Sequence, residues 1–289
     1  MPKTKVAVDV SNLAYRSSFA HKTLTTQDGR FSGHVFGAVS SLLSFAKKFP
    51  EGVDFIFCYD GSTSKKERQK ILPEYKAHRI PHEINPLPEV SAIIRMIPGV
   101  HILQDDMEGD DAIAFAVTKI PGEVVVLSAD KDLWGLITGV KVSVYSPNLG
   151  RYVVLSDIIE EFHVNDPNRV YLAKALFGDP SDGIKGIERL TKKQVEPILA
   201  AQNVTDVESF YGKLGSTKPE FISDKNWDKL LSSKDKVLTN YKVITPKLNF
   251  KKESLMVYKG GIEPLLSALE SYECISLLDG VKDIFGKVL

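Results

Sequence analysis

The chain has 289 residues, of which 43% are hydrophobic and 26% are charged, and its 37 lysine and arginine residues balance its 37 aspartate and glutamate residues. This composition is ordinary for a soluble globular protein with one large or two smaller domains. The net charge of zero excludes attraction of nucleic acid by the overall field, so any such affinity must come from local basic clusters.

The cysteines and the apolar runs indicate the compartment. Cys58 and Cys274 are far apart and have no CxxC spacing, which supports neither a zinc site nor a disulfide framework. Residues 1–5 lead straight into a predicted strand without an apolar signal segment, and no run of about 18 apolar residues occurs. We expect a cytoplasmic protein, in the host cytoplasm if a phage encodes it, with no membrane partner.

The first 180 residues alternate between β-rich runs and helical patterns, which predicts an α/β fold with a mainly parallel central sheet flanked by helices. Apolar spacing and helix-ending residues predict helices at 34–49 and 110–120. The predicted strands are residues 5–10, 54–59, 123–127 and 142–145, with 151–154 as a hairpin partner.

Two later regions have a different pattern. Residues 61–85 are polar and basic with little apolar periodicity, which indicates an excursion from the sheet. From about residue 181 the pattern is mostly helical, with a final helical pair at 262–285. We therefore expect an α/β domain at 1–180 and a helical C-terminal region at 181–289.

Nine carboxylates lie at turn positions, many of them directly after predicted strands. Ligands of parallel sheets gather at the carboxyl ends of the strands, where four of these acids would converge, namely Asp9, Asp60, Asp130 and Asp132. Carboxylate oxygens suit hard cations such as Mg²⁺ and Mn²⁺, and so many packed acids would repel one another without a cation. The pattern predicts a metal-dependent phosphoryl-transfer enzyme. The nine are Asp9, Asp60, Glu108, Asp110, Asp111, Asp130, Asp132, Asp179 and Asp182.

Structural interpretations of the same residues remain open. Acids in the first turn of a helix are favoured by the helix dipole, and Asp130 can be an ordinary N-cap. Asp179 and Asp182 can be turn residues, and the basic run can be solvated surface. Capping explains each acid separately but does not explain why several follow strand ends.

Six motifs occur in order between about residues 5 and 190: Val8-Asp9-Val10-Ser11-Asn12, Tyr59-Asp60-Gly61, Leu72-Pro73-Glu74-Tyr75-Lys76-Ala77-His78-Arg79, Glu108-Gly109-Asp110-Asp111, Ser128-Ala129-Asp130-Lys131-Asp132-Leu133 and Gly178-Asp179-Pro180-Ser181-Asp182. Together they resemble the 5′ nucleases or flap endonucleases, which include the 5′ nuclease domain of bacterial DNA polymerase I and stand-alone phage enzymes. The Tyr145-Ser146-Pro147 segment and the long polar carboxyl half look more like the phage branch, which includes a phage ribonuclease H.

The resemblance implies two Mg²⁺ ions, for which Mn²⁺ can substitute. It places one ion on Asp9, Asp60, Glu108 and Asp110. It places the second on Asp111, Asp130, Asp132 and Asp182, with Asp179 nearby.

The resemblance also makes residues 61–85 a helical arch through which a single-stranded 5′ end passes. Lys76 and Arg79, expected on one helix face, would be catalytic residues facing the scissile phosphate. Tyr15 or Tyr75 would stack on a base. Further nucleic-acid contacts are predicted from Lys65, Lys66 and Arg68.

One departure from the family concerns its glycine-rich helix-hairpin-helix. Arg189 and Thr191 stand where glycines are expected, and non-glycine residues resist positive φ. Duplex binding would then depend on phosphate contacts from Lys185, Arg189, Lys192 and Lys193.

The implied activity is that of a 5′-3′ exonuclease or structure-specific flap endonuclease acting in replication, for example in primer removal. Its partners would be DNA with a 5′ flap, a nick or a single-stranded 5′ end, an RNA:DNA hybrid, and other replication proteins, and the chain would be a monomer. The alternatives are a PIN-like metal-dependent ribonuclease and a non-catalytic DNA-junction binder. A haloacid dehalogenase type phosphatase is disfavoured because Asp9-Val10-Ser11 lacks the second aspartate.

Overall fold

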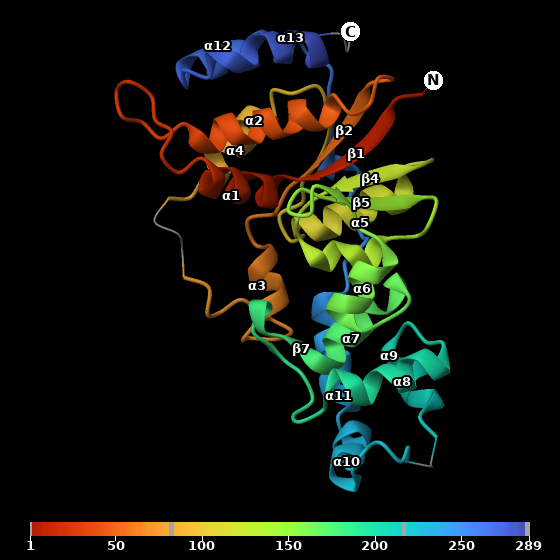
Figure 1. Ribbon diagram of the computed structural model, residues 1–289. Helices are drawn as coiled ribbons and strands as arrows, with labels where there is room; N and C mark the ends of the chain where they lie inside the picture. The colour runs from red at the N-terminus through yellow and green to blue at the C-terminus, as the bar shows by residue number, and fades with distance from the viewer. Residues whose placement is uncertain (1, 81–83, 216–217, 287–289) are drawn as a thin grey trace. The chain divides into compact units, whose positions relative to one another are not determined.

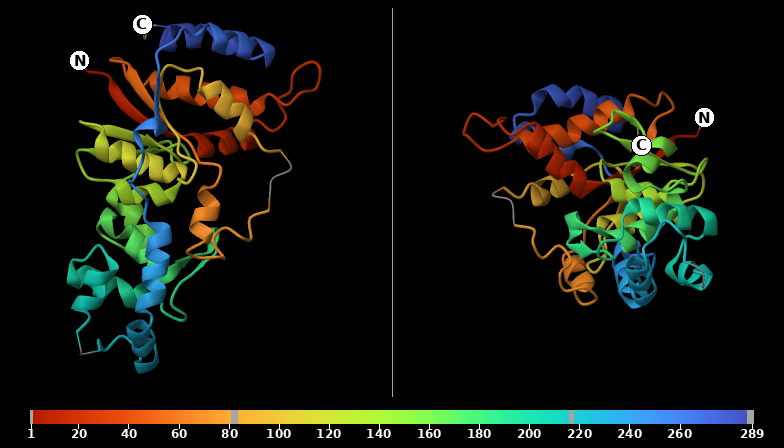
Figure 2. Two further views of the ribbon diagram at one scale, coloured as in Figure 1. Left: turned by 180° about the vertical axis from the view of Figure 1, so that it is seen from behind. Right: turned by 60° about the horizontal axis from the view of Figure 1, so that its bottom comes forward.

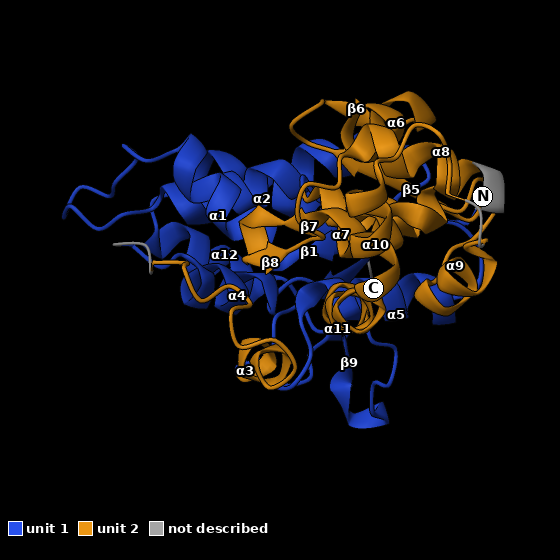
Figure 3. Ribbon diagram, turned by 90° about the horizontal axis from the view of Figure 1, so that it is seen from below, with its two compact units in different colours: residues 1–62, 81–129, 247–289 blue, residues 63–80, 130–246 orange. Residues whose placement is uncertain are grey.

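The computed structural model describes residues 2–80, 84–215 and 218–286 of the chain (Figure 1). The chain forms two compact units, each assembled from segments that are distant in sequence (Figure 3). Unit 1 consists of Met1–Ser62, Pro81–Ala129 and Lys247–Leu289, and unit 2 consists of Thr63–Ile80 and Asp130–Pro246. The bounds of these units differ from the expected domain boundary at residue 180. A nuclease domain at 1–180 and a DNA-binding region at 181–289 therefore stay a prediction.

Unit 1 is built on a mostly parallel sheet with the strand order β4-β1-β2-β3-β9. β1 runs parallel to β2 and β4, β3 runs parallel to β2, and only β9 is antiparallel to its neighbour β3. The inner strands are apolar runs, which is typical of a parallel sheet covered on both faces. The strands are β1 (Thr4–Asp9), β2 (Val53–Cys58), β3 (Gly99–Ile102), β4 (Val124–Leu127) and β9 (Leu255–Tyr258).

The helices of unit 1 cover both faces of this sheet (Figures 1 and 2). Right-handed crossovers place the helices between β1, β2 and β3 on one face, and the returning helix between β3 and β4 on the other. Accordingly α1, α2 and α4 pack together, whereas α5 packs on β1 and β2. The helices are α1 (Val10–Ala20), α2 (Gly33–Ala46), α4 (Leu87–Ile94), α5 (Gly109–Lys119), α12 (Glu263–Ser271) and α13 (Leu278–Phe285), with 3-10 turns at Lys252–Ser254 and Ile275–Leu277.

Unit 2 is mostly helical, with α7 packed against α11 at its centre. Its helices are α3 (Ser64–Gln69), α6 (Leu155–Phe162), α7 (Val170–Phe177), α8 (Lys192–Gln202), α9 (Val207–Lys213), α10 (Asp224–Ser232) and α11 (Lys234–Ile244). Unit 2 also contains two antiparallel strand pairs: β5 (Val142–Ser146) with β6 (Arg151–Tyr152), and β7 (Gly178–Asp179) with β8 (Ile184–Lys185). It has three 3-10 turns, at Lys131–Leu136 (η1), Pro167–Arg169 (η2) and Pro180–Asp182 (η3).

The predicted α/β class is confirmed, and the predicted strands and helices of the first 180 residues are observed with small shifts of their ends. The strands β3 and β9 were not predicted from the sequence. Within the described residues, no helix is both long and apolar enough to cross a membrane.

The prediction of a helical arch over residues 61–85 is wrong in its extent. Among the described residues of this segment only Ser64–Gln69 is α-helical, and residues 70–80 form turns. Lys76 has a φ of 50°, which breaks any helix that would place Lys76 and Arg79 on one face. Pro73 also disfavours a helical conformation at residue 72. Residues 81–83 of the predicted arch lie outside the described residues.

Candidate metal centre and nucleic-acid interface

Asp9 is the last residue of β1. The strand order of the sheet reverses between β1 and its neighbour β4. Doubly wound sheets bind ligands beyond the carboxyl ends of the strands at such a reversal. The side chain of Asp9 is 6% exposed and caps α1 by accepting a hydrogen bond from the amide of Asn12 at 2.9 Å. Its second oxygen accepts a hydrogen bond from the Ser128 hydroxyl at 2.8 Å, just beyond β4. Asp9 therefore ties the carboxyl ends of two neighbouring strands.

Asp60 follows β2 and connects the starts of two helices. Its Oδ1 accepts a hydrogen bond from the amide of Gly109 at 2.6 Å, and its other oxygen accepts one from the Ser11 hydroxyl. A Cβ at position 109 would lie 3.3 Å from Asp60 Oδ1, so glycine suits this close approach. Asp9 and Asp60 are thus brought to the same end of the sheet, as expected.

Glu108 and Asp111 form the N-terminal cap of α5. The amide of Glu108 donates to Asp111 Oδ2 at 2.9 Å, and the amide of Lys247 donates to Asp111 Oδ1 at 2.7 Å. Asp111 is only 1% exposed. This pattern matches the capping interpretation for Asp111. The same side chain also binds the backbone of Lys247, where the chain re-enters unit 1.

Asp110 lies in the first turn of α5 and close to Cys58, which ends β2. Burial raises the pKa of the Cys58 thiol, and the negative charges of Asp9 and Asp110 raise it further. Cys58 therefore stays protonated and packs as a small apolar group.

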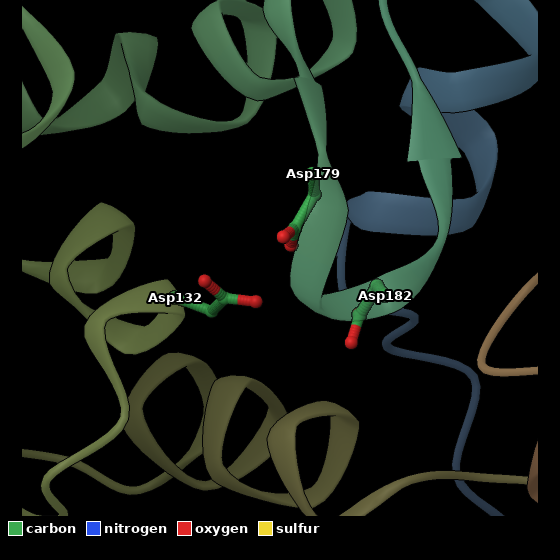
Figure 4. A group of neighbouring side chains, drawn as sticks. All are labelled: Asp132, Asp179 and Asp182. Atoms are coloured by element: carbon green, nitrogen blue, oxygen red, sulfur yellow. The ribbon is translucent and has the colours of Figure 1, made fainter. Parts of the chain in front are cut away.

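The tightest acidic group lies in unit 2. Oxygen atoms of Asp132, Asp179 and Asp182 all lie within 4.8 Å of one another, and no other such group occurs in the part of the chain that the structure describes. Asp132 comes from η1, whereas Asp179 and Asp182 flank the tight turn η3; Figure 4 shows Asp132 and Asp179 directed toward each other. Three carboxylates so arranged fit a hard divalent cation.

Lys174 contacts this acidic group from α7. Its ammonium forms ion pairs with Asp132 and, at 2.7 Å, with Asp179. Burial acts to lower the pKa of Lys174, but the charges of Asp132 and Asp179 outweigh it and raise the pKa. Lys174 is therefore a buried, permanently charged partner of the acids.

Lys76 and Arg79 both reach Asp182. Arg79 pairs with its Oδ1 at 2.6 Å, and the Lys76 ammonium lies 4.0 Å from its Oδ2. The amide of Lys76 also donates to the backbone oxygen of Asp182 at 2.7 Å. Both predicted catalytic cations are thus held at the acidic group without sharing a helix face.

The pKa shifts of the three acids reflect burial and neighbouring charge. Burial raises the pKa of Asp132, against the effect of Lys174, and burial likewise raises that of Asp182, against Lys76. Burial also acts to raise the pKa of Asp179, but Lys174 and the hydrogen bonds of Ser181 outweigh it and lower the pKa. Asp130, the remaining predicted ligand, caps η1 by accepting from the amide of Asp132 at 2.9 Å.

Two predicted nucleic-acid contacts are wrong because their side chains are buried. Tyr75 is 2% exposed and packs with Ile184 and Val243, so it cannot stack on a base. Arg68 is 2% exposed and donates to the backbone oxygen of Val243, so it cannot contact a phosphate. Lys65 and Lys66 on α3 are exposed, and Tyr15 is half-buried, so their predicted roles stay predictions.

The segment 186–193 lacks the expected glycines at positions 189 and 191, but residue 189 still adopts the left-handed backbone conformation that favours glycine. Arg189 has a φ of 61°, and its carbonyl accepts a hydrogen bond from the Asn226 side chain at 3.1 Å. Thr191 caps α8, with its amide donating to Gln194 at 3.1 Å. The basic side chains expected to bind duplex phosphates are all exposed, and their role stays a prediction: Lys185, Arg189, Lys192 and Lys193.

Three residues that contact the acids were not predicted from the sequence: Lys174, Ser11 and Ser128. The signal for Lys174 was a single charge in the otherwise apolar helix Val170–Phe177, since a buried lysine needs a carboxylate partner. The two serines gave no signal of their own, because hydroxyl groups are common after strands and at helix starts.

The motifs and their geometry agree with comparisons to known proteins. Residues 4–168 match the family described as "5'-3' exonuclease, N-terminal resolvase-like domain". The chain belongs to this family. The resemblance seen in the six sequence motifs is thereby confirmed, as is the enzyme class of 5′ nuclease.

Relatives of the nuclease include chains of its own length and parts of longer proteins. It is 29% identical to a 5′-3′ exonuclease of Aquifex aeolicus over 98% of this chain and 96% of that protein. It is also 29% identical to the thermostable DNA polymerase I of Thermus thermophilus, over 78% of this chain but only 27% of the polymerase.

Solved structures share the fold of the nuclease. The zinc-bound T5 5′-exonuclease has a TM-score of 0.67 at 22% identity and covers 99% of this chain and 100% of that one. Flap endonuclease-1 from Methanococcus jannaschii has a TM-score of 0.56 at 12% identity and covers 99% and 92%. These findings favour the 5′ nuclease over the PIN-like ribonuclease.

Proposed function

We propose that this nuclease hydrolyses phosphodiester bonds at single-stranded 5′ ends and at single-strand to duplex junctions of DNA, with Mg²⁺ as its cation and Mn²⁺ as a substitute. The observation that carries the proposal is the convergence of Asp132, Asp179 and Asp182 within 4.8 Å, contacted by Lys76 and Arg79. A relative with the same fold, the T5 D15 flap endonuclease, was solved with DNA and metal ions.

Divalent cations bound to these acids would neutralise phosphate charge and make an attacking water more acidic. The residues that would hold them are the carboxylates of unit 2, namely Asp130, Asp132, Asp179 and Asp182, and those of unit 1, namely Asp9, Asp60, Glu108 and Asp110. Asp111 would support α5 through its two backbone amide contacts.

Lys76 and Arg79 would bind the scissile phosphate and stabilise the negative charge that grows on it during hydrolysis. Their present partner is Asp182, whose neutralisation by a cation would release both side chains for the phosphate. Because Lys76 is held by its backbone to Asp182, its ammonium is already positioned near the acids.

The duplex would be bound by exposed basic side chains, since phosphate contacts fix register and orientation without reading sequence. The candidates are Lys65, Lys66, Lys185, Arg189, Lys192 and Lys193, and Tyr15 would contact a base. We further propose that RNA:DNA hybrids are substrates and that other replication proteins deliver the DNA.

The test is digestion of 5′-labelled flapped, nicked and single-stranded DNA, of a labelled RNA:DNA hybrid and of labelled single-stranded RNA, with Mg²⁺, Mn²⁺ or a chelator. We expect metal-dependent release of short 5′ products from the flapped and nicked DNA. Binding of the flap without cleavage in any metal would instead identify a non-catalytic junction binder. Cleavage restricted to single-stranded RNA would contradict the proposed substrate class.

A further inference from the structure

Lys174 is the one residue of the acidic group that neither the sequence motifs nor the proposed chemistry explains. It lies in the middle of α7, whose sequence Val-Tyr-Leu-Ala-Lys-Ala-Leu-Phe is otherwise apolar and largely buried. Its own side chain is 7% exposed. An ammonium buried to this degree is stable only if charged partners replace its lost hydration.

The partners of Lys174 are two of the three potential cation ligands. Its ammonium contacts Asp132 and lies 2.7 Å from Asp179, while Asp182 is paired instead with Arg79. A divalent cation that binds the three carboxylates must therefore compete with Lys174 for oxygens of Asp132 and Asp179. Lysine also holds these acids close together, although like charges otherwise repel.

We propose that Lys174 is a resident counter-ion of this acidic group. It holds Asp132 and Asp179 in place before a cation arrives, and it weakens the affinity of the group for that cation. This inference rests on the proposed use of divalent metal. Lys174 is accordingly a positioning residue that sets the cation concentration at which the group is filled.

The test is Mn²⁺ binding to the full chain without nucleic acid, followed by electron paramagnetic resonance of the free ion. The binding step of this group is the one that Asp182→Asn weakens or removes. We expect Lys174→Gln to raise the Mn²⁺ affinity of this step by about tenfold or more, because a unit positive charge next to the ligands is removed. In chelator, the melting temperature of Lys174→Gln should be lower than that of the unaltered chain. Addition of Mn²⁺ should raise the melting temperature of the variant by more than that of the unaltered chain.

Lys131→Gln is the matched control, because Lys131 is adjacent to Asp132 in sequence but forms an exposed ion pair with Glu161. Its Mn²⁺ affinity should stay within about twofold of that of the unaltered chain, since exposed pairs contribute little. A lysine with a merely structural role gives the opposite result for Lys174→Gln, namely a loss of Mn²⁺ affinity. Unchanged or weaker binding by folded Lys174→Gln protein overturns the proposal.

A second pair of variants tests the proposal if Lys174→Gln does not fold. Asp179→Asn and the double variant Asp179→Asn/Lys174→Met differ only in the ammonium, which in the single variant still competes for Asp132. The double variant should bind Mn²⁺ more tightly, and equal binding overturns the proposal. Absence of Mn²⁺ binding in every chain also overturns it, whereas Mn²⁺ binding without DNA cleavage contradicts only the proposed function.

Discussion

The two groups of acids in this nuclease are stabilised by different partners. In unit 1, Asp9, Asp60 and Asp111 accept hydrogen bonds from backbone amides and serine hydroxyls, which are neutral donors. In unit 2, Asp132, Asp179 and Asp182 are paired with the cations Lys174, Lys76 and Arg79. The acids of unit 2 thus have cationic partners, whereas neutral groups donate the hydrogen bonds described for Asp9, Asp60 and Asp111.

The sequence alone does not show whether an acid stabilises the fold or takes part in the chemistry, and the difference in partners distinguishes these two roles. Asp111 is bonded to two backbone amides and fixes the local backbone, so its loss should appear first in stability. A carboxylate bonded to cations in a compact acidic group controls local charge, so its loss should appear first in chemistry. Substitutions in the two units therefore test whether the two groups of acids differ in role.

The largest effect is expected for Asp132→Asn in unit 2. It removes a charge from the three-carboxylate group, and the single-turnover cleavage rate of a 5′ flap should fall by on the order of 10²-fold or more. Flap affinity in Ca²⁺ should change little. Normal turnover at saturating Mg²⁺ would show that the unit 2 acids are only structural.

Lys76→Met should have the next largest effect. The substitution keeps an unbranched apolar side chain beside the Tyr75 ring, whose centroid lies 4.7 Å from the ammonium, but removes the charge near Asp182. The single-turnover rate should fall by about 10²-fold with duplex binding retained. Lys70→Met, which removes only an exposed pair with Glu67, serves as the control. A near-normal rate for Lys76→Met would contradict its catalytic role.

Asp111→Asn tests the amide-bonded acids of unit 1. One side-chain oxygen becomes an NH₂ group that faces a backbone N–H, which should cost about 2 kcal/mol of unfolding free energy at this buried site. Urea unfolding measures the loss. A chain of unchanged stability that has lost cleavage would instead make Asp111 a cation ligand, as the family resemblance implies.

The smallest effect is expected for Asp157→Asn, far from either acidic group in sequence. Hydrogen bonds from Arg151 and from the amide of Val154 lower the pKa of Asp157 to about 2. Because the folded pKa lies below the unfolded value of about 3.9, this stabilisation is present above pH 4 and is lost as the pH falls toward 2. Because water screens the exposed pair with Arg151, the variant should lose no more than about 1 kcal/mol at pH 7.

Thermal unfolding between pH 7 and pH 3 checks this prediction. The difference in melting temperature between Asp157→Asn and the unaltered chain should narrow below about pH 4. A difference that is independent of pH would show that the loss has another origin than the charge of Asp157.

The sequence predicted most of the fold and most of the acids because both depend on local patterns. Apolar runs and helical spacing located β1, β2, β4, α2 and α5 within a few residues. β9 was missed because its place beside β3 depends on a pairing between residues 255–258 and 99–102. Such long-range pairing leaves no periodic signal in either segment.

The basic segment shows where local patterns fail. The polar and basic composition predicted an excursion from the sheet, and the family resemblance implied an arch. Arg68 and Tyr75 are nevertheless buried against residues of α11 and β8. A charged side chain can be buried when a carbonyl distant in sequence accepts its hydrogen bonds, and only the folded chain supplies that partner. The left-handed conformation of Arg189 is likewise a tertiary outcome, with Asn226 bonded to its carbonyl.

The family, the α/β class and the candidate acids follow from the amino-acid sequence, because motif order and hydrophobic pattern are properties of the chain. The donors that each acid receives depend on the folded structure: amides and hydroxyls for Asp9, Asp60 and Asp111, and the Lys174 ammonium for Asp132 and Asp179. These partners are distant in sequence, and electrostatic energy depends on separation in space.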